Sequence, residues 1–246
     1  MRRVTELTIC LAVVSALGGG GANAVAQSDE YPTMGPVEQY LMGKDAEIAL
    51  ARSAAPDSIS HGATILVLGR QGYESAVRGR NGFVCFVARS WLAAFDWPEF
   101  WNPKIRAPDC MNPQAARFLV PIVLLRSRMT MAGRSKEEVV AALRTAFANR
   151  EVPGLDHGAM EYMMAKGAYL TDQGEHNAPH LMFLAAGVAP EDWGAGAAGS
   201  PVMAAPYWYF SSRDPSDLEG LPHILVFLVG VADWSDGTPA TRHGSP

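Results

Sequence analysis

The sequence predicts an α+β fold built on a mainly antiparallel sheet. Short apolar runs, split by glycine-rich turns, occupy residues 63–89, and helix signals follow over residues 113–166. Almost continuously apolar runs then return at 180–187 and 223–231. Strands that precede and follow a block of helices, instead of alternating with it, are typical of α+β proteins. We therefore expect an N-terminal three-stranded meander, an intervening helical segment and two or three C-terminal strands.

The N-terminus has the pattern of a cleavable secretory signal peptide. Arg2 and Arg3 precede an apolar stretch over residues 7–17, which is too short to span a bilayer as a helix. Small residues follow, and cleavage after Ala26 would fit a small-x-small site. An uncleaved membrane anchor is the alternative. After the signal we expect a flexible arm over residues 27–36.

The first strands are predicted from tight-turn signals. A helix is expected over residues 37–52, because its apolar residues have helical spacing. Runs at 63–69, 72–77 and 82–89 are separated by Gly-Arg-Gln-Gly and Gly-Arg-Asn-Gly. Glycine and asparagine supply the positive φ angles that hairpin turns require, so these runs predict the antiparallel meander.

Two cysteines remain once the signal peptide is removed. Cys10 leaves with the signal, and Cys85 and Cys110 stay in the chain. In an exported protein one such pair most simply forms one disulfide. Closing a loop of this length would contribute about 3 kcal/mol to stability. Two buried free thiols, or one catalytic thiol, are the alternatives.

Helix signals fill the middle of the chain. Asn112-Pro113 provides an N-cap and first turn for a helix over 113–131, which Pro121 should kink or split. Residues 135–138, Ser-Lys-Glu-Glu, match a capping box at the start of a second helix. A third short helix is expected over 159–166.

The C-terminal third contains two similar strand-loop units. Each unit has Pro-His, an apolar run, Gly-Val-Ala and then Asp-Trp; the histidines are His180 and His223. If the two units are neighbours in matching register, these histidines lie near the same edge, although the similarity can also be coincidence. A further short strand is expected at 207–210. The single domain should span 37–234, followed by a disordered tail over 235–246.

Histidines and glutamates form the polar cluster of most interest. Four residues separate His157 from Glu161, so a helix would place both on one face, where they could chelate a metal. The candidate cluster consists of His157, Glu161, Glu175, His176, His180 and His223. These side chains suit zinc or another transition metal, although no His-Glu-x-x-His motif is present. Alternatively, the histidines cap structural elements, or act in acid–base chemistry without a metal.

An aromatic stretch supplies candidate ligand-stacking residues, namely Trp91, Trp97 and Trp101. Such a stretch can also simply pack over a sheet. The formal net charge of −5 argues against nucleic-acid binding, which needs a basic face. Beyond the signal, no apolar run is long enough for a transmembrane helix.

The segments 161–166, 179–183 and 234–239 resemble parts of uncharacterised exported bacterial proteins. This resemblance implies bacterial export and carries no fold, activity or functional residue to this chain. We expect a periplasmic or secreted protein. The favoured function is non-catalytic ligand binding or association with the cell envelope, and the alternative is a metal-dependent hydrolase that uses the histidine/glutamate cluster.

Overall fold

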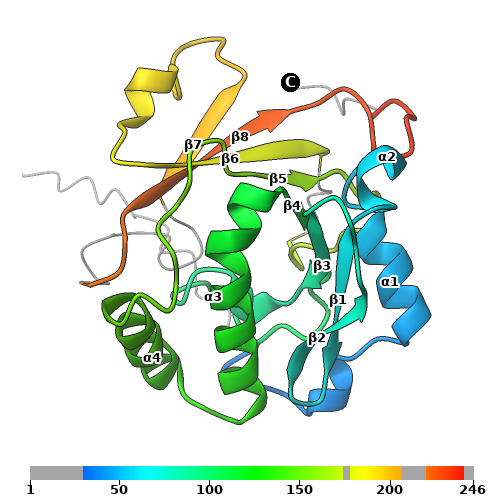
Figure 1. The fold of residues 1–246 in the computed structure, drawn as a ribbon, viewed down its shortest axis with the longest axis vertical. Coiled ribbons are helices and arrows are strands. Elements are labelled where there is room, and N and C mark those ends of the chain that lie inside the picture. Colours follow the sequence, from blue (N-terminus) through cyan, green and yellow to red (C-terminus); the bar gives the residue numbers. More distant parts are fainter. Residues whose placement is uncertain (1–29, 174–177, 207–219, 241–246) are drawn as a thin grey trace, which may run out of the picture.

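The computed structural model describes residues 30–173, 178–206 and 220–240 (Figure 1). Within these residues, eight strands form one mixed, mostly antiparallel sheet of order β2-β1-β3-β4-β5-β6-β8-β7. The strands are β1 (Thr64–Gly69), β2 (Gly72–Val77), β3 (Val84–Ala88), β4 (Ala107–Met111), β5 (Met160–Met163), β6 (His180–Ala186), β7 (Val202–Pro206) and β8 (Ile224–Gly230). The helices are α1 (Lys44–Arg52), α2 (Asp57–Ser60), α3 (Pro113–Met131) and α4 (Lys136–Ala148), with short 3₁₀ turns at Val37–Gln39, Ser90–Leu92 and Pro190–Trp193. The predicted α+β class is confirmed.

The predicted N-terminal meander is wrong in its third strand. β1 and β2 form an antiparallel hairpin, but β3 lies on the other side of β1 and runs parallel to it. The connection from β2 therefore crosses the start of β1. It can pass there because Gly79 has no side chain: a Cβ at this position would lie 2.2 Å from the backbone nitrogen of Thr64.

The predicted disulfide is confirmed, and it joins two neighbouring strands. Cys85 of β3 lies directly opposite Cys110 of β4, and the two are bonded. Both are fully buried, in a small core that β1, β3 and β4 form with Ala51 of α1 and with alanines of the segment between α1 and β1. The disulfide thus lies on the face of the sheet that α1 covers.

The larger core lies on the opposite face, under α3 (Figure 1). Phe86 of β3 and Met111 of β4 pack there with apolar side chains of α3. The predicted cap is present, since the Asn112 side chain accepts a hydrogen bond of 2.9 Å from the Ala115 nitrogen. α3 runs on through Pro121 without being split.

The α4 capping box is also present, between Ser135 and Glu138. The helix predicted over 159–166 is absent: residues Met160–Met163 form β5, paired with both β4 and β6. The helix expected over 37–52 is a 3₁₀ turn followed, after a break, by α1. Strands β4 and β7 were not expected from the sequence.

The two similar C-terminal units do become neighbouring strands, but antiparallel ones. His180 lies opposite Gly230, while Ile224, next to His223, lies opposite Ala186. The two histidines are therefore at opposite ends of the ladder, about 20 Å apart at the rise of an extended strand. The prediction that they share an edge is wrong, because it assumed matching strand direction.

Several predicted features lie outside the described residues: the signal peptide with the first three residues of the flexible arm (27–29), and the strand at 207–210. Part of the predicted tail is placed, and there Asp236 forms an ion pair of 2.6 Å with Lys166. Over the described ranges, no helix combines the length and apolar character needed to cross a membrane.

Candidate pocket between the sheet and the segment after β3

A pocket of about 360 Å³ lies between the segment that follows β3 and the C-terminal half of the sheet. Its lining combines the segment that follows β3 with residues from six strands, β3 to β8. The residues are Ala88, Arg89, Ser90, Leu92, Ala93, Ala94, Trp97, Ile105, Ala107, Asp109, Met163, Leu170, His180, Met182, Ala205 and Leu228. Most of these side chains are apolar, as is typical of small-molecule sites.

The floor of the pocket is the face of the sheet opposite the disulfide. Side chains alternate along a strand, so Ala107 and Asp109 of β4 point away from the face that carries Cys110. Met163 of β5 and Met182 of β6 extend the same face. The pocket thus lies on the same face of the sheet as the larger core under α3, and the disulfide with the smaller core lies on the other face.

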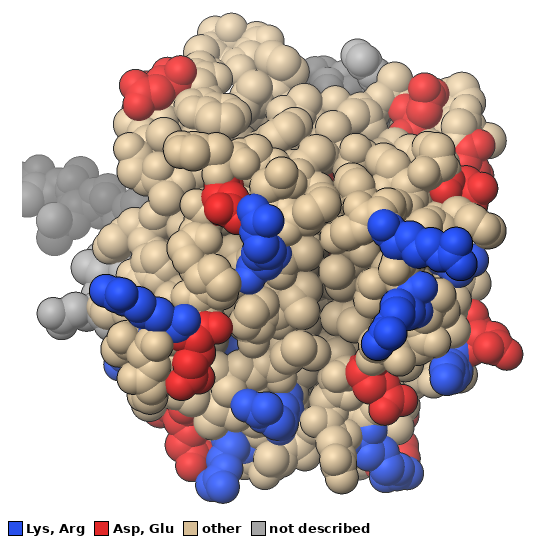
Figure 2. Space-filling view, viewed as in Figure 1, with Lys and Arg blue, Asp and Glu red and all other residues tan. Residues whose placement is uncertain are grey.

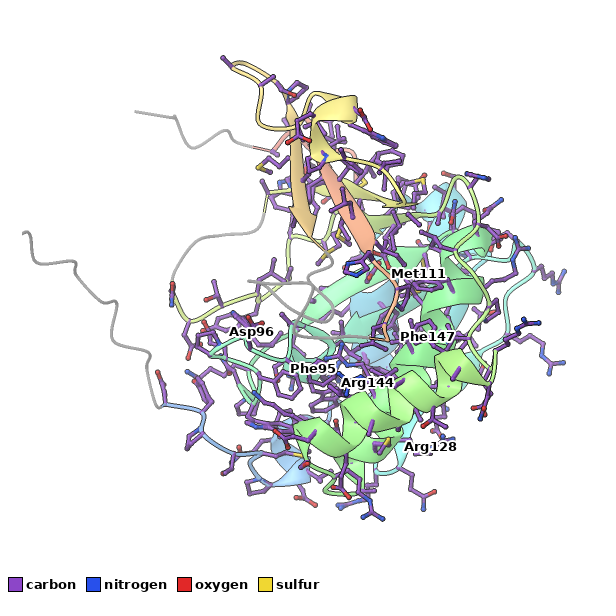
Figure 3. The ribbon with its side chains drawn as sticks, turned by 90° about the vertical axis from the view of Figure 1, so that its left-hand side faces the viewer. Phe95, Asp96, Met111, Arg128, Arg144 and Phe147 are labelled. Carbon is purple, nitrogen blue, oxygen red and sulfur yellow. A yellow bond between two sulfur atoms is a disulfide. The ribbon has the colours of Figure 1, made fainter. Side chains whose placement is uncertain are left out.

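The wall opposite the floor is held by Arg126 from α3. This buried arginine donates a hydrogen bond of 2.6 Å to the carbonyl oxygen of Ala93 and another to that of Trp91. Its guanidinium carbon lies 4.3 Å from the centre of the Phe95 ring. Figure 3 shows Phe95 and Asp96 on this segment, beside α4 and below β7 and β8. These contacts fix the wall relative to the helices.

A second buried arginine anchors the start of the wall. Arg89 donates a 2.8 Å hydrogen bond to Glu47 of α1 and a 2.8 Å bond to the Tyr40 carbonyl oxygen. It also donates to the carbonyl oxygen of Val87. Both charged residues are essentially inaccessible, at 0% exposure for Glu47 and 1% for Arg89. The guanidinium of Arg89 is therefore already used inside the protein.

Two more buried polar side chains, besides Arg89, line the pocket. Ser90 is 1% exposed, and its hydroxyl has no hydrogen-bond partner within the described part of the chain. Asp109 is 2% exposed and lies on the floor. Neither belongs to the predicted candidates. Asp109 was missed because β4 was not recognised as a strand, and Ser90 because a single serine after a strand carries no motif.

His180 completes the polar part of the lining. Burial is the main cause that lowers its pKa, so the ring is neutral at pH 7. Its Nδ1 lies 2.8 Å from the carbonyl oxygen of Ala178. A carbonyl only accepts, so Nδ1 must carry the proton and Nε2 is left as an acceptor.

The three predicted stacking tryptophans have different environments. Trp97 is half-buried and lines the pocket. Trp91 is fully buried, and its indole nitrogen donates a 3.1 Å bond to Ser127. Trp101 packs edge-on against Phe100, with ring centres 4.7 Å apart. Trp97 is therefore the one of the three placed to contact a ligand here.

The remaining members of the predicted polar cluster do not gather around His180. Glu161 is buried on β5, on the same face as Asp109, without lining the pocket. His157 and His223 are exposed. Glu175 and His176 lie outside the described residues. Within the placed ranges, no group of three His, Cys, Asp or Glu side chains is arranged to hold a metal ion.

The charged surface is mixed in sign. Figure 2 shows Lys and Arg interspersed with Asp and Glu over the face that carries α3 and α4. Several of these charges form exposed ion pairs, such as Arg117 with Asp156 and Arg70 with Glu38.

Two arguments thus converge on the pocket as the candidate site: its largely apolar lining, and the placement of Ser90, Asp109 and His180 within it. No protein-family model, curated protein or solved structure matches this chain, so the site rests on its own geometry.

Proposed function

We propose that this is an exported protein that binds a small, largely apolar ligand in the pocket beside Trp97. The observation that carries the proposal is a preformed cavity of about 360 Å³ whose apolar lining includes buried polar side chains. Ligand sites in proteins commonly have volumes of about 300–1,000 Å³ and combine an apolar lining with a few placed polar groups. One water molecule occupies about 30 Å³ in the liquid, so the pocket could hold a ligand of on the order of a dozen non-hydrogen atoms.

Export is supported by the signal-peptide pattern and by the disulfide. A buried disulfide is typical of proteins from oxidising compartments. The Cys85–Cys110 bond is therefore consistent with function in the periplasm or outside the cell. In that location the protein would bind a ligand from the surroundings or the envelope.

The test is ligand binding by the purified, oxidised protein, with and without a blocked pocket. Neutral hydrophobic probes such as N-phenyl-1-naphthylamine report occupation by increased fluorescence. Ala205→Phe would place a ring into the pocket from β7 and should abolish the signal. Met203→Phe is the matched control: Met203 is two residues away on the same strand, is 61% exposed and does not line the pocket.

Retained probe binding in Ala205→Phe, with both variants folded, would show that the probe binds elsewhere and would contradict the proposal. Absence of binding by the unmodified protein across a panel of neutral apolar compounds would do the same. Unfolding curves for both variants separate a blocked pocket from a damaged fold.

A further inference from the structure

A short strap of chain, residues 169–172, contributes to the wall of the pocket. Leu170 is the residue of this strap that lines the cavity, and it packs against the buried cluster of the floor that includes Met163. At the start of the strap, Tyr169 forms two backbone hydrogen bonds with Arg106, of 2.8 and 2.9 Å. This backbone pair joins one end of the strap to the sheet, just before β4.

The other end of the strap is held through Asp172. Its carboxylate accepts a 2.8 Å hydrogen bond from Nζ of Lys104 and a 2.5 Å bond from the hydroxyl of Tyr169. The hydroxyl of Tyr31, in the N-terminal arm, donates a third bond to the same carboxylate. The backbone nitrogen of Asp172 donates a 3.0 Å bond to Glu99, which is 4% exposed. Every one of these bonds involves a side chain, unlike the backbone pair at Tyr169.

The side-chain bonds at Asp172 are open to water. The Lys104 side chain is 54% exposed and that of Asp172 is 18% exposed. Water competes for such bonds, so each contributes little to stability. Segments held by few buried contacts open locally while the rest of the protein stays folded. The strap can therefore be released at Asp172 while it stays joined to the sheet at Tyr169.

Resting on the proposed function, we infer that the strap is a gate of the pocket: release of Asp172 withdraws Leu170 from the lining, and the ligand enters and leaves through this opening. Asp172 is a positioning residue, since it acts through Leu170 and does not itself line the cavity. Tyr31 makes the N-terminal arm part of the closed state.

The test measures the rate constants kon and koff for N-phenyl-1-naphthylamine by stopped-flow fluorescence. Tyr31→Phe removes one hydrogen bond to Asp172 and should raise both rate constants by about two- to tenfold. Asp172→Ala removes all three bonds to the carboxylate and should raise both by about tenfold or more. The Kd should change little, because the gate stays mostly closed and its release speeds entry and exit equally.

Asp156→Ala is the matched control. It breaks an ion pair of 2.5 Å with Arg117, in which both side chains are partly exposed, and neither residue lines the pocket. Both rate constants should equal those of the unmodified protein.

Amide hydrogen exchange of the ligand-free protein gives a second measurement. In Tyr31→Phe the amide of Asp172 should exchange faster, because the strap is released more often. The amide of Tyr169 is bonded to the Arg106 carbonyl oxygen and should keep its protection.

The outcomes separate the gate from the proposed function. If the probe binds and both rate constants are unchanged in Tyr31→Phe and Asp172→Ala, the pocket is a ligand site but the strap is not its gate. A rise in koff alone, with a weaker Kd, would show that the strap only contributes affinity, and would also overturn the inference. If Asp172→Ala does not fold, Tyr31→Phe decides between these outcomes. If the unmodified protein does not bind the probe, the proposed function fails and the inference fails with it.

Discussion

The buried Glu47–Arg89 ion pair should be essential to the stability of the fold. Glu47→Gln keeps the size of the side chain, and its carbonyl oxygen can still accept from the Leu68 nitrogen, as Glu47 does at 3.1 Å. The substitution removes only the charge that compensates Arg89. It also adds an amide at the position of Oε2, which has no hydrogen-bond partner within the described residues.

The expected loss can be estimated from this geometry. Removing one partner of a buried ion pair typically costs about 3–5 kcal/mol, because the other charge stays buried without compensation. For a domain of this size such a loss corresponds to a fall in melting temperature of roughly 10 °C. An exposed pair gives a scale for comparison: Glu38 and Arg70 are 60% and 69% exposed, so solvent screens their attraction and Glu38→Gln should cost far less than Glu47→Gln.

Urea unfolding of both variants, followed by circular dichroism, measures the two free energies of unfolding. The double variant Glu47→Leu, Arg89→Met should recover much of the lost stability, since apolar replacements of a buried pair are often neutral or stabilising. The reasoning is refuted if Glu47→Gln costs no more than Glu38→Gln. It is also refuted if the double variant is less stable than Glu47→Gln.

Three further predictions concern other parts of the fold. Replacing Cys85 and Cys110 by alanine should lower the free energy of unfolding by about 3 kcal/mol in urea titrations. Ligand affinity should be unchanged, because the disulfide lies on the opposite face of the sheet from the pocket. A large loss of affinity in the folded variant would contradict this second expectation. Gly79→Ala should strongly destabilise the protein, because its Cβ would lie 2.2 Å from the backbone of β1. Gly154→Ala should be nearly neutral, because no atom lies within 4 Å of the added Cβ. Equal melting temperatures of the two variants would show that the connection after β2 does not cross the start of β1. In the folded protein the pKa of His180 is below its ordinary value of 6.5. The contribution of His180 to the free energy of unfolding should therefore be complete above pH 6.5 and decrease as the pH falls below this value, because the unfolded state then binds the proton more readily. The loss of stability at low pH should be smaller in His180→Gln. If stability depends on pH in the same way in both proteins, the prediction is wrong.

Helices α3 and α4 were predictable because their starts are encoded locally. Asn112 and the box from Ser135 to Glu138 form hydrogen bonds within one helical turn, so residues close in sequence specify where α3 and α4 begin. The disulfide was predictable by elimination, since two cysteines remain after the predicted signal peptide. These features depend on no distant contact.

The sheet order and the site depend on distant contacts. A glycine-rich connection after β2 fits either a hairpin or a crossing, and the choice rests on the contact between Gly79 and Thr64. Glu161 was expected on a helix, but the short segment around it is held as a strand by pairing with β4 and β6 on both sides. Ser90 and Asp109 meet in the pocket only once this pairing is known.

The position of Ala205 gives the pocket a wall that can open without global unfolding. Among the described strands, β7 lies at the edge of the sheet and pairs with β8. Segments with one pairing partner open more readily than the centre of a sheet, as amide hydrogen exchange detects. Exchange at β7 should therefore be faster than at β6, which has strands on both sides, and a bound ligand should slow it. Such protection would show that the bound ligand stabilises this wall of the pocket.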